Sequence, residues 1–191
     1  RQMLVSDPVA IFYLTGKWLH PGERFLGLYL NADTQPQLFL NDLFRFDEEI
    51  GAVKVPITDT TDLITLLKAY VDHSAPLGVD KELAAKFLIP MYDAKIASGI
   101  RNTSLAIDNA RALKDAQEIE WMRESSRIND RAMEQFKACI REGVTEKEEA
   151  STGGWLDVCA PFTRELLYYM IPTLNLRVLT VLFYLKRLMT C

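Results

Sequence analysis

The sequence predicts an α/β fold, in which strands and helices alternate along the chain and pack against one another as layers. Over residues 1–110, short apolar runs of strand length alternate with segments whose apolar residues recur at helical spacing. The chain has 191 residues, of which 49% are hydrophobic and 25% are charged. This composition is ordinary for a globular protein, so we expect a packed core. The length allows one domain and part of a second.

The amino-terminal part contains four strand candidates and one helix. Residues 3–5 form a short strand candidate, and Asp7-Pro8 then supply a capping residue and a proline suited to the first helical turn. The helix over residues 9–14 should end near Gly16. The remaining strand candidates are residues 24–30, 37–40 and 52–55, the first two joined by a polar turn at residues 31–33.

Two helices and two strands are predicted next. Residues 62–71 form an amphipathic helix because the apolar side chains lie on one face, at Leu63, Leu66, Leu67 and Tyr70. Residues 77–79 form a short strand candidate, and residues 81–92 form a second amphipathic helix. Residues 95–100 are a further strand candidate.

A long helix over residues 115–141 is the clearest element in the sequence. Asp115 is placed to start it, and Gly143 lies just past its end. Its apolar stripe has helical spacing and consists of Ile119, Met122, Met133, Phe136 and Ile140. Thr145 and Glu148 then have the spacing of a capping box, which predicts the start of another helix.

Charge and cysteine content exclude several classes of protein. The net charge is −4 and the isoelectric point is near 5.3, which argues against a nucleic-acid-binding surface. Cys139, Cys159 and Cys191 form no CxxC pair, so a zinc knuckle or a thioredoxin-like motif is excluded. The odd cysteine count and the lack of a secretory signal favour the cytoplasm. Because position 1 is Arg, we interpret the chain as a fragment whose true start is missing.

Four short motifs occur in a familiar order. The stretch of residues 109–122 (NARALKDAQEIEWM) contains Arg-x-x-Lys followed by Glu-Ile, at Arg111, Lys114, Glu118 and Ile119. Residues 142–146 read Glu-Gly-Val-Thr-Glu, residues 11–16 read Ile-Phe-Tyr-Leu-Thr-Gly, and residues 78–80 read Gly-Val-Asp. Each motif alone is weak, but their order and spacing are fairly specific.

Together these motifs resemble the M24 metallopeptidase family, which contains Xaa-Pro dipeptidase, aminopeptidase P and creatinase. The resemblance covers about residues 1–150. It implies a creatinase-like N-terminal α/β domain over residues 1–110, with a mixed β-sheet flanked by helices. It also implies that residues 111–150 are the first one or two helices of a truncated pita-bread catalytic domain.

The resemblance further implies hydrolysis of peptides before proline, with two divalent metal ions such as manganese, cobalt or zinc. The family's ligands are two aspartates, one histidine and two glutamates, all beyond the matched segment. We therefore expect no catalytic residue, no metal site and no bound cofactor in this chain. We also expect an inactive fragment that forms a homodimer in the cytoplasm, and peptide substrate is expected only for the intact enzyme.

The chain has two histidines, and only one lies where the resemblance suggests a role. His73 follows the predicted helix over residues 62–71, where a cation at the carboxyl end is favourable without any metal. His20 lies with Trp18 in residues 16–24, a loop between a helix and a strand. In the family this loop can cover the active site of the partner subunit, so Trp18 and His20 are candidate substrate contacts across the dimer. The alternative is a surface loop with a solvated histidine.

Other charged clusters have simple interpretations. The acidic run Asp47-Glu48-Glu49 is typical of a solvated turn. Glu118, Glu120 and Glu124 share a helix with Arg123 and Arg127 at ion-pair spacing. No GxSxG, P-loop or GxGxxG motif occurs.

The resemblance ends abruptly after Ala150. Residues 151–191 begin with Ser-Thr-Gly-Gly-Trp, contain four basic residues against two acidic ones, and are rich in Leu, Tyr and Phe. The apolar run of residues 178–185 is too short to span a bilayer, so no membrane span is expected. The change favours a tail translated in a wrong reading frame. The alternative is a genuine divergent tail that packs on the domain or on a partner.

Three functional hypotheses follow. The first is a truncated Xaa-Pro peptidase that lacks its metal ligands. The second is a stand-alone non-catalytic module that dimerises with, or regulates, a full-length peptidase. The third is a fragment of a creatinase-type amidinohydrolase, which shares the fold. Sequence from the catalytic domain would separate the first hypothesis from the third.

Overall fold

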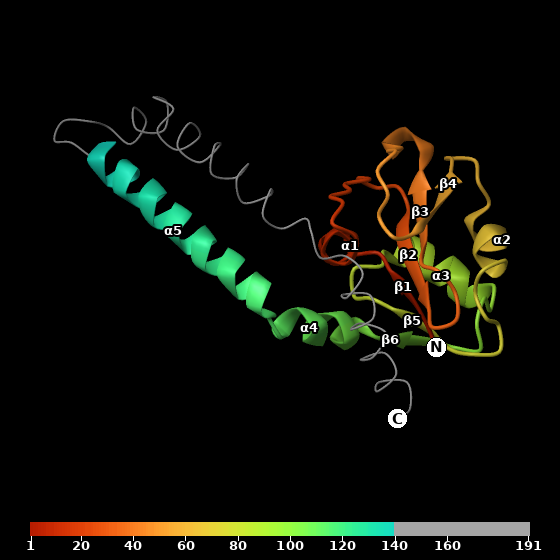
Figure 1. Ribbon diagram of the computed structural model, residues 1–191. Coiled ribbons are helices and arrows are strands. Elements are labelled where there is room, and N and C mark those ends of the chain that lie inside the picture. Colours follow the sequence, from red (N-terminus) through yellow and green to blue (C-terminus); the bar gives the residue numbers. More distant parts are fainter. Residues whose placement is uncertain (140–191) are drawn as a thin grey trace. The chain divides into compact units, whose positions relative to one another are not determined.

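The computed structural model describes residues 1–139 of the chain. Its centre is a six-stranded sheet with the strand order β4-β3-β2-β1-β5-β6 (Figure 1). The strands are β1 (Gln2–Val5), β2 (Leu26–Asn31), β3 (Gln37–Asn41), β4 (Val53–Ile57), β5 (Leu77–Val79) and β6 (Ile100–Asn102). β2 pairs antiparallel with β1 and β3, whereas β1–β5, β5–β6 and β3–β4 are parallel. The predicted mixed sheet is therefore confirmed.

Four helices accompany the sheet in the first compact unit, which includes residues 1–113. They are α1 (Pro8–Thr15), α2 (Leu63–Lys68), α3 (Ala85–Asp93) and α4 (Ser104–Ala112). A single 3₁₀ turn, η1 (Asp42–Phe44), follows β3. The second unit begins at Lys114 and contains the long helix α5 (Ala116–Cys139).

The core divides into two clusters, one on each face of the sheet, because successive strand residues point to opposite faces. On one face, Met3 and Val5 of β1 pack with α1 and α4, whose buried residues include Ile11 and Ile107. On the other face, Leu4 packs with residues from α2 and α3, such as Leu67 and Met91. The helices thus cover both faces of the sheet, as an α/β layer fold requires (Figure 1).

Local sequence fixes where the first two helices begin and where α1 ends. Asp7 caps α1 by accepting from the N–H groups of Val9 and Ala10 at 2.9 and 3.2 Å. Asp62 caps α2 in the same way. Gly16 ends α1 with a left-handed φ of 69°, and its N–H donates to the Phe12 carbonyl. The Asp7 cap and the end at Gly16 follow the sequence prediction.

The Gly-Val-Asp motif at the end of β5 has a structural explanation. A Cβ on Gly78 would lie 2.5 Å from Thr103 Oγ1, so only glycine lets Thr103 pack across the strand. Asp80 is buried, and its carboxylate accepts from the N–H groups of Ser6 and Asp7 and from the Ser6 hydroxyl. The motif therefore joins β5 to the start of α1, across the parallel pair β1–β5.

A buried amide group joins β1 to the segment before β5. Gln2 has no exposed surface, and its Nε2 donates to the carbonyls of Asp72 and Ala75. Its Oε1 accepts from the Tyr29 hydroxyl at 2.7 Å and from the Asp72 N–H at 2.8 Å. All four hydrogen-bonding positions of the amide are filled, so this polar group is tolerated in the core.

Two sequence predictions need correction, and one helix was not predicted. The strand predicted at residues 95–100 is wrong: β6 begins at Ile100, and Lys95 has a left-handed φ of 48° in the turn after α3. The helix predicted at residues 81–92 begins only at Ala85. The helix α4 was not predicted, because Ile107 is its only large buried residue beside Ser104, Ala106 and Ala110, and packing on the sheet decides its conformation.

The helix α5 confirms most of the prediction for residues 115–141. Asp115 and Glu118 form a reciprocal capping box, in which the Glu118 N–H donates to Asp115 Oδ1 at 2.7 Å and the Asp115 N–H donates to Glu118 Oε2 at 3.0 Å. Ion pairs join Arg123 to Glu120 and Arg127 to Glu124, as their spacing predicts. The predicted capping box at residues 145–148 and the expectations for residues 151–191 lie outside the described residues.

Candidate functional site

The candidate site lies on the loop of residues 16–25, which connects α1 to β2. Its side chains alternate between solvent and core. Trp18 is 53% exposed and His20 is exposed, whereas Leu19 and Pro21, which follow them in turn, are buried. The two sequence-predicted residues therefore lie on the solvent side of one short loop whose other side is anchored in the core. The Trp18 ring also rests edge-on against Phe12 of α1, with centroids 5.7 Å apart.

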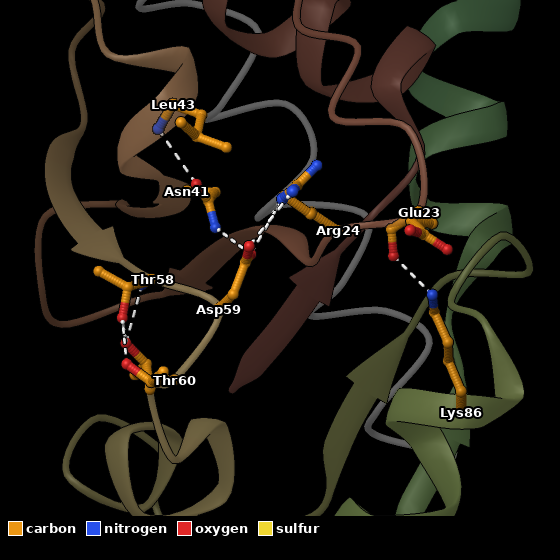
Figure 2. Close-up of polar contacts among 9 residues, drawn as sticks. Glu23, Arg24, Asn41, Leu43, Thr58, Asp59, Thr60 and Lys86 are labelled. Atoms are coloured by element: carbon orange, nitrogen blue, oxygen red, sulfur yellow. Dashed lines mark hydrogen bonds and ion pairs between the residues drawn. The ribbon is translucent and has the colours of Figure 1, made fainter.

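The end of the loop next to β2 is held by an ion pair. Arg24 donates from Nε to Asp59 Oδ1 at 2.9 Å and from Nη2 to Oδ2 at 3.2 Å (Figure 2). Asp59 lies just after β4 and also accepts from Asn41 Nδ2 at 2.9 Å. The Asn41 side chain in turn accepts from the Leu43 N–H, at the start of η1. Arg24 is thus fixed in a two-point geometry suited to a carboxylate.

Two lysines hold the loop from other elements. Lys86 of α3 donates to the Glu23 carbonyl oxygen at 2.6 Å (Figure 2). Lys17 pairs with Glu48 at 2.6 Å and lies over the Phe46 ring, 4.8 Å from its centroid. Of the acidic run, Glu48 is therefore an anchor for the loop, although all three of its residues are exposed, as predicted for a solvated turn.

These contacts shift the ionisation of the groups involved. The hydrogen bonds from Arg24, together with its positive charge, hold the pKa of Asp59 below its usual value. Asp59 raises the pKa of Arg24 in return. The hydrogen bond from Lys17 lowers the pKa of Glu48. All these carboxylates remain ionised at neutral pH, so the anchors are ion pairs there.

A cavity of about 340 Å³ lies beside the Arg24–Asp59 pair. It is lined by loop residues, by the ends of β3 and β4 and by α3, including Glu23, Arg24, Asn41, Asp59, Lys86 and Phe87. Sequence reasoning did not find Asn41, Asp59 or Lys86. They come from three separate elements, and nothing in the sequence indicates that these elements meet at Arg24.

The remaining histidine has a structural contact. His73 lies in a turn after α2, which ends at Lys68, so the prediction that His73 sits at a helix end is wrong. Its Nδ1 is 2.8 Å from the Ile96 carbonyl oxygen. Within residues 1–139, no group of three or more His, Cys, Asp or Glu side chains is arranged to hold a metal ion. No helix in this part of the chain combines the length and hydropathy needed to cross a bilayer.

The fold and the anchored loop define a mixed-sheet α/β domain that presents two side chains, one aromatic and one imidazole, at its surface. The sequence model of the creatinase/prolidase N-terminal domain family matches residues 1–124. The chain belongs to this family of domains.

Known relatives extend this finding. The chain is 26% identical over 156 residues to uncharacterized peptidases of Staphylococcus aureus strains MSSA476 and MW2, covering 75% of this chain and 41% of each relative. The chain thus spans less than half the length of the curated relatives it matches. A dipeptidase from Pyrococcus horikoshii OT3 is similar with a TM-score of 0.66, at 24% identity over 86% of this chain and 46% of that protein. A prolidase from Thermococcus sibiricus is similar with a TM-score of 0.65, at 22% identity over 89% of this chain and 44% of that protein. At these identities the two structures establish the shared fold.

Proposed function

We propose that this chain is the N-terminal part of a Xaa-Pro peptidase, an enzyme that hydrolyses the peptide bond before proline. The observation that carries the proposal is the family membership over residues 1–124. The names of the relatives support it, because they include peptidases, a dipeptidase and a prolidase. The proposed organisation is an N-terminal domain over residues 1–110, the first catalytic-domain helices over residues 111–150, and a divergent tail.

The proposed role of the loop is to cover the active site of the partner subunit in a cytoplasmic homodimer. Trp18 and His20 would then contact the peptide substrate. Their exposure supports this role, since side chains already used in the core would not be available. The anchoring of Lys17, Glu23 and Arg24 supports it as well, because a loop held before binding loses less conformational entropy when it contacts a ligand.

Metal chemistry would fall to other parts of the longer protein. A pair of divalent ions such as manganese, cobalt or zinc requires several carboxylates and a histidine. Residues 1–139 offer no cluster of three such ligands, so this part of the chain does not fit the metal pair. We therefore propose that the chain is inactive by itself and that its contribution is structural.

The first experiment incubates the purified chain with Leu-Pro and manganese and measures free proline. No release above the buffer rate is expected. Release that depends on both chain and metal would contradict the proposed inactivity. Sedimentation of the same sample tests the proposed homodimer, and a monomer across the whole concentration range would contradict it.

The second experiment sequences the encoding DNA beyond codon 150 and translates all three frames. A frame with aspartates, a histidine and glutamates at family spacing would support the peptidase, and the protein from that frame can then be assayed. In that longer protein, Trp18→Ala and His20→Ala should raise KM for Leu-Pro, whereas His73→Ala, at the other histidine, should not. Hydrolysis of creatine instead would favour the amidinohydrolase, and a real end at Cys191 would favour the stand-alone module.

A further inference from the structure

The cavity beside the Arg24–Asp59 pair has two chemically different sides. Its volume of about 340 Å³ falls within the usual range of sites for small ligands. Its polar lining comes from the loop, the turn after β4 and α3. The other side includes the rings of Phe25 and Phe87, which meet edge-to-face with centroids 5.1 Å apart. Ile57 and Leu63 extend this apolar lining.

The polar lining of the cavity has hydrogen-bond donors that are available to a ligand. Within the described part of the chain, Arg24 uses Nε and Nη2 on Asp59, which leaves the donors of Nη1 for another acceptor. Lys86 donates one hydrogen bond, to the Glu23 carbonyl, although an ammonium group has three donors. Lys86 is exposed, and its Nζ lies over the Phe87 ring, 5.0 Å from the centroid. The Lys86 ammonium group is therefore next to the apolar lining of the cavity.

The charges favour a monoanion. The Asp59 carboxylate accepts three hydrogen bonds, two from Arg24 and one from Asn41, so its charge is neutralised locally. In Figure 2 the carboxylate of Glu23 is directed away from Arg24. This leaves the Lys86 ammonium as the cation whose contact is a neutral carbonyl. One remaining cation matches one negative charge, and the apolar lining matches a hydrophobic body, so a carboxylate on an apolar body fits this cavity better than a dianion such as phosphate.

We propose that this cavity binds a small carboxylate that bears a short hydrophobic group. The ligand's carboxylate accepts hydrogen bonds from Lys86 and Arg24, and its hydrophobic group contacts Phe25 and Phe87. The ligand is a free small acid or the carboxyl terminus of a peptide, since both present this chemistry. The site is separate from the proposed contacts of Trp18 and His20, and it does not depend on the peptidase function.

Isothermal titration of the full chain tests the site, with isovalerate as the free acid and acetyl-Ala-Leu as the peptide terminus. Isovaleramide has the same shape without the charge, and we expect it to bind at least about tenfold more weakly than isovalerate, because charge-assisted hydrogen bonds are lost. Tighter binding of acetyl-Ala-Leu would identify the peptide source, and tighter binding of isovalerate the free acid. No saturable binding of either carboxylate would overturn the proposal.

Variants identify the cation involved. Lys86→Met keeps the length of the side chain and should weaken binding of the preferred carboxylate at least about tenfold, since the charge-assisted contact is lost. Lys86→Arg should restore most of the affinity. Lys68→Met, at an exposed lysine of α2 outside the cavity, is the matched control and should leave binding unchanged. Circular dichroism checks that each variant is folded, and equal affinities of folded Lys86→Met and the unaltered chain would overturn the assignment.

Discussion

Arg24 and Asp59 form a two-point ion pair that joins the end of the loop before β2 to the turn after β4, although 35 positions separate them in the sequence. The pair, drawn in Figure 2, fixes one end of the loop of residues 16–25. Its partner Asn41 comes from the end of β3, the strand between β2 and β4. Three neighbouring strands therefore position one guanidinium group.

Replacing Asp59 with Asn should make this loop more mobile without unfolding the domain. In Asp59→Asn, Arg24 loses its charged partner, and amide hydrogen exchange should accelerate in residues 20–25. Exchange in β1 and β5 should not change, since their hydrogen bonds do not involve the pair. Asp47→Asn, at an exposed position of the acidic run, is the matched control. If both variants exchange like the unaltered chain, the ion pair does not hold the loop.

The same pair should contribute to stability in a pH-dependent way. Arg24 lowers the native pKa of Asp59, so the unfolded chain takes up this proton first as the pH falls. The contribution is present above the unfolded pKa of about 3.9 and is lost as the pH falls through the lower native pKa. Urea unfolding of the unaltered chain and of Asp59→Asn should show a difference that shrinks from about pH 5 to about pH 2. A constant difference would contradict this.

Asp80 should be needed as a side chain in which both oxygens accept hydrogen bonds. Its two oxygens accept from the N–H groups of Ser6, Asp7 and Glu82 and from the Ser6 hydroxyl. In Asp80→Asn either orientation of the amide leaves at least one backbone N–H facing another donor. We expect a loss of about 1–3 kcal/mol in the free energy of unfolding. Asp33→Asn in an exposed turn serves as control, and equal losses at both positions would refute the explanation.

Gly78 should be intolerant of a methyl group because Thr103 packs against it. A Cβ at this position would lie 2.5 Å from Oγ1 and 2.8 Å from Cγ2 of Thr103, so Gly78→Ala should cost about 1–3 kcal/mol. At Gly99 a Cβ would meet nothing within 4 Å, which makes Gly99→Ala the matched control. Adding Thr103→Ala to Gly78→Ala removes both short contacts and should recover part of the loss. Absence of any recovery would show that crowding by Thr103 is not the cause.

Tyr29 should make the domain sensitive to alkali. Burial raises the pKa of its hydroxyl, so the native state keeps the proton at a pH where the unfolded chain has lost it. The corresponding stability is present below the unfolded pKa of about 10 and is lost as the pH rises through the native pKa. The stability difference between the unaltered chain and Tyr29→Phe should therefore fall above about pH 10. Tyr92→Phe controls for the loss of an exposed hydroxyl. If the stability difference between the unaltered chain and Tyr29→Phe does not change with pH, the prediction is wrong.

Elements specified by their own residues were predicted well. The strand at residues 77–79 was placed correctly, and so were the cap at Asp7 and the end of α1 at Gly16. The cap and the helix end depend on contacts within a few residues, such as a side-chain oxygen that meets the N–H two or three positions later. The prediction of a strand at residues 95–100 was wrong because an apolar run does not reveal whether a pairing partner lies beside it. Its last residue, Ile100, is the first one that pairs with β5.

The sequence by itself determined the α/β class, most of the elements and the motifs that mark the family, because apolar spacing and capping are local properties. It also indicated Trp18 and His20, and their proposed contact with substrate stays a prediction. Only the tertiary structure decided that Arg24 meets Asp59 and that Lys86 reaches the Glu23 carbonyl. These residues come together because the pairing of β2, β3 and β4 and the packing of α3 bring distant segments to one edge of the sheet. Pairing and packing of that kind depend on the whole core, and no short stretch of sequence encodes them.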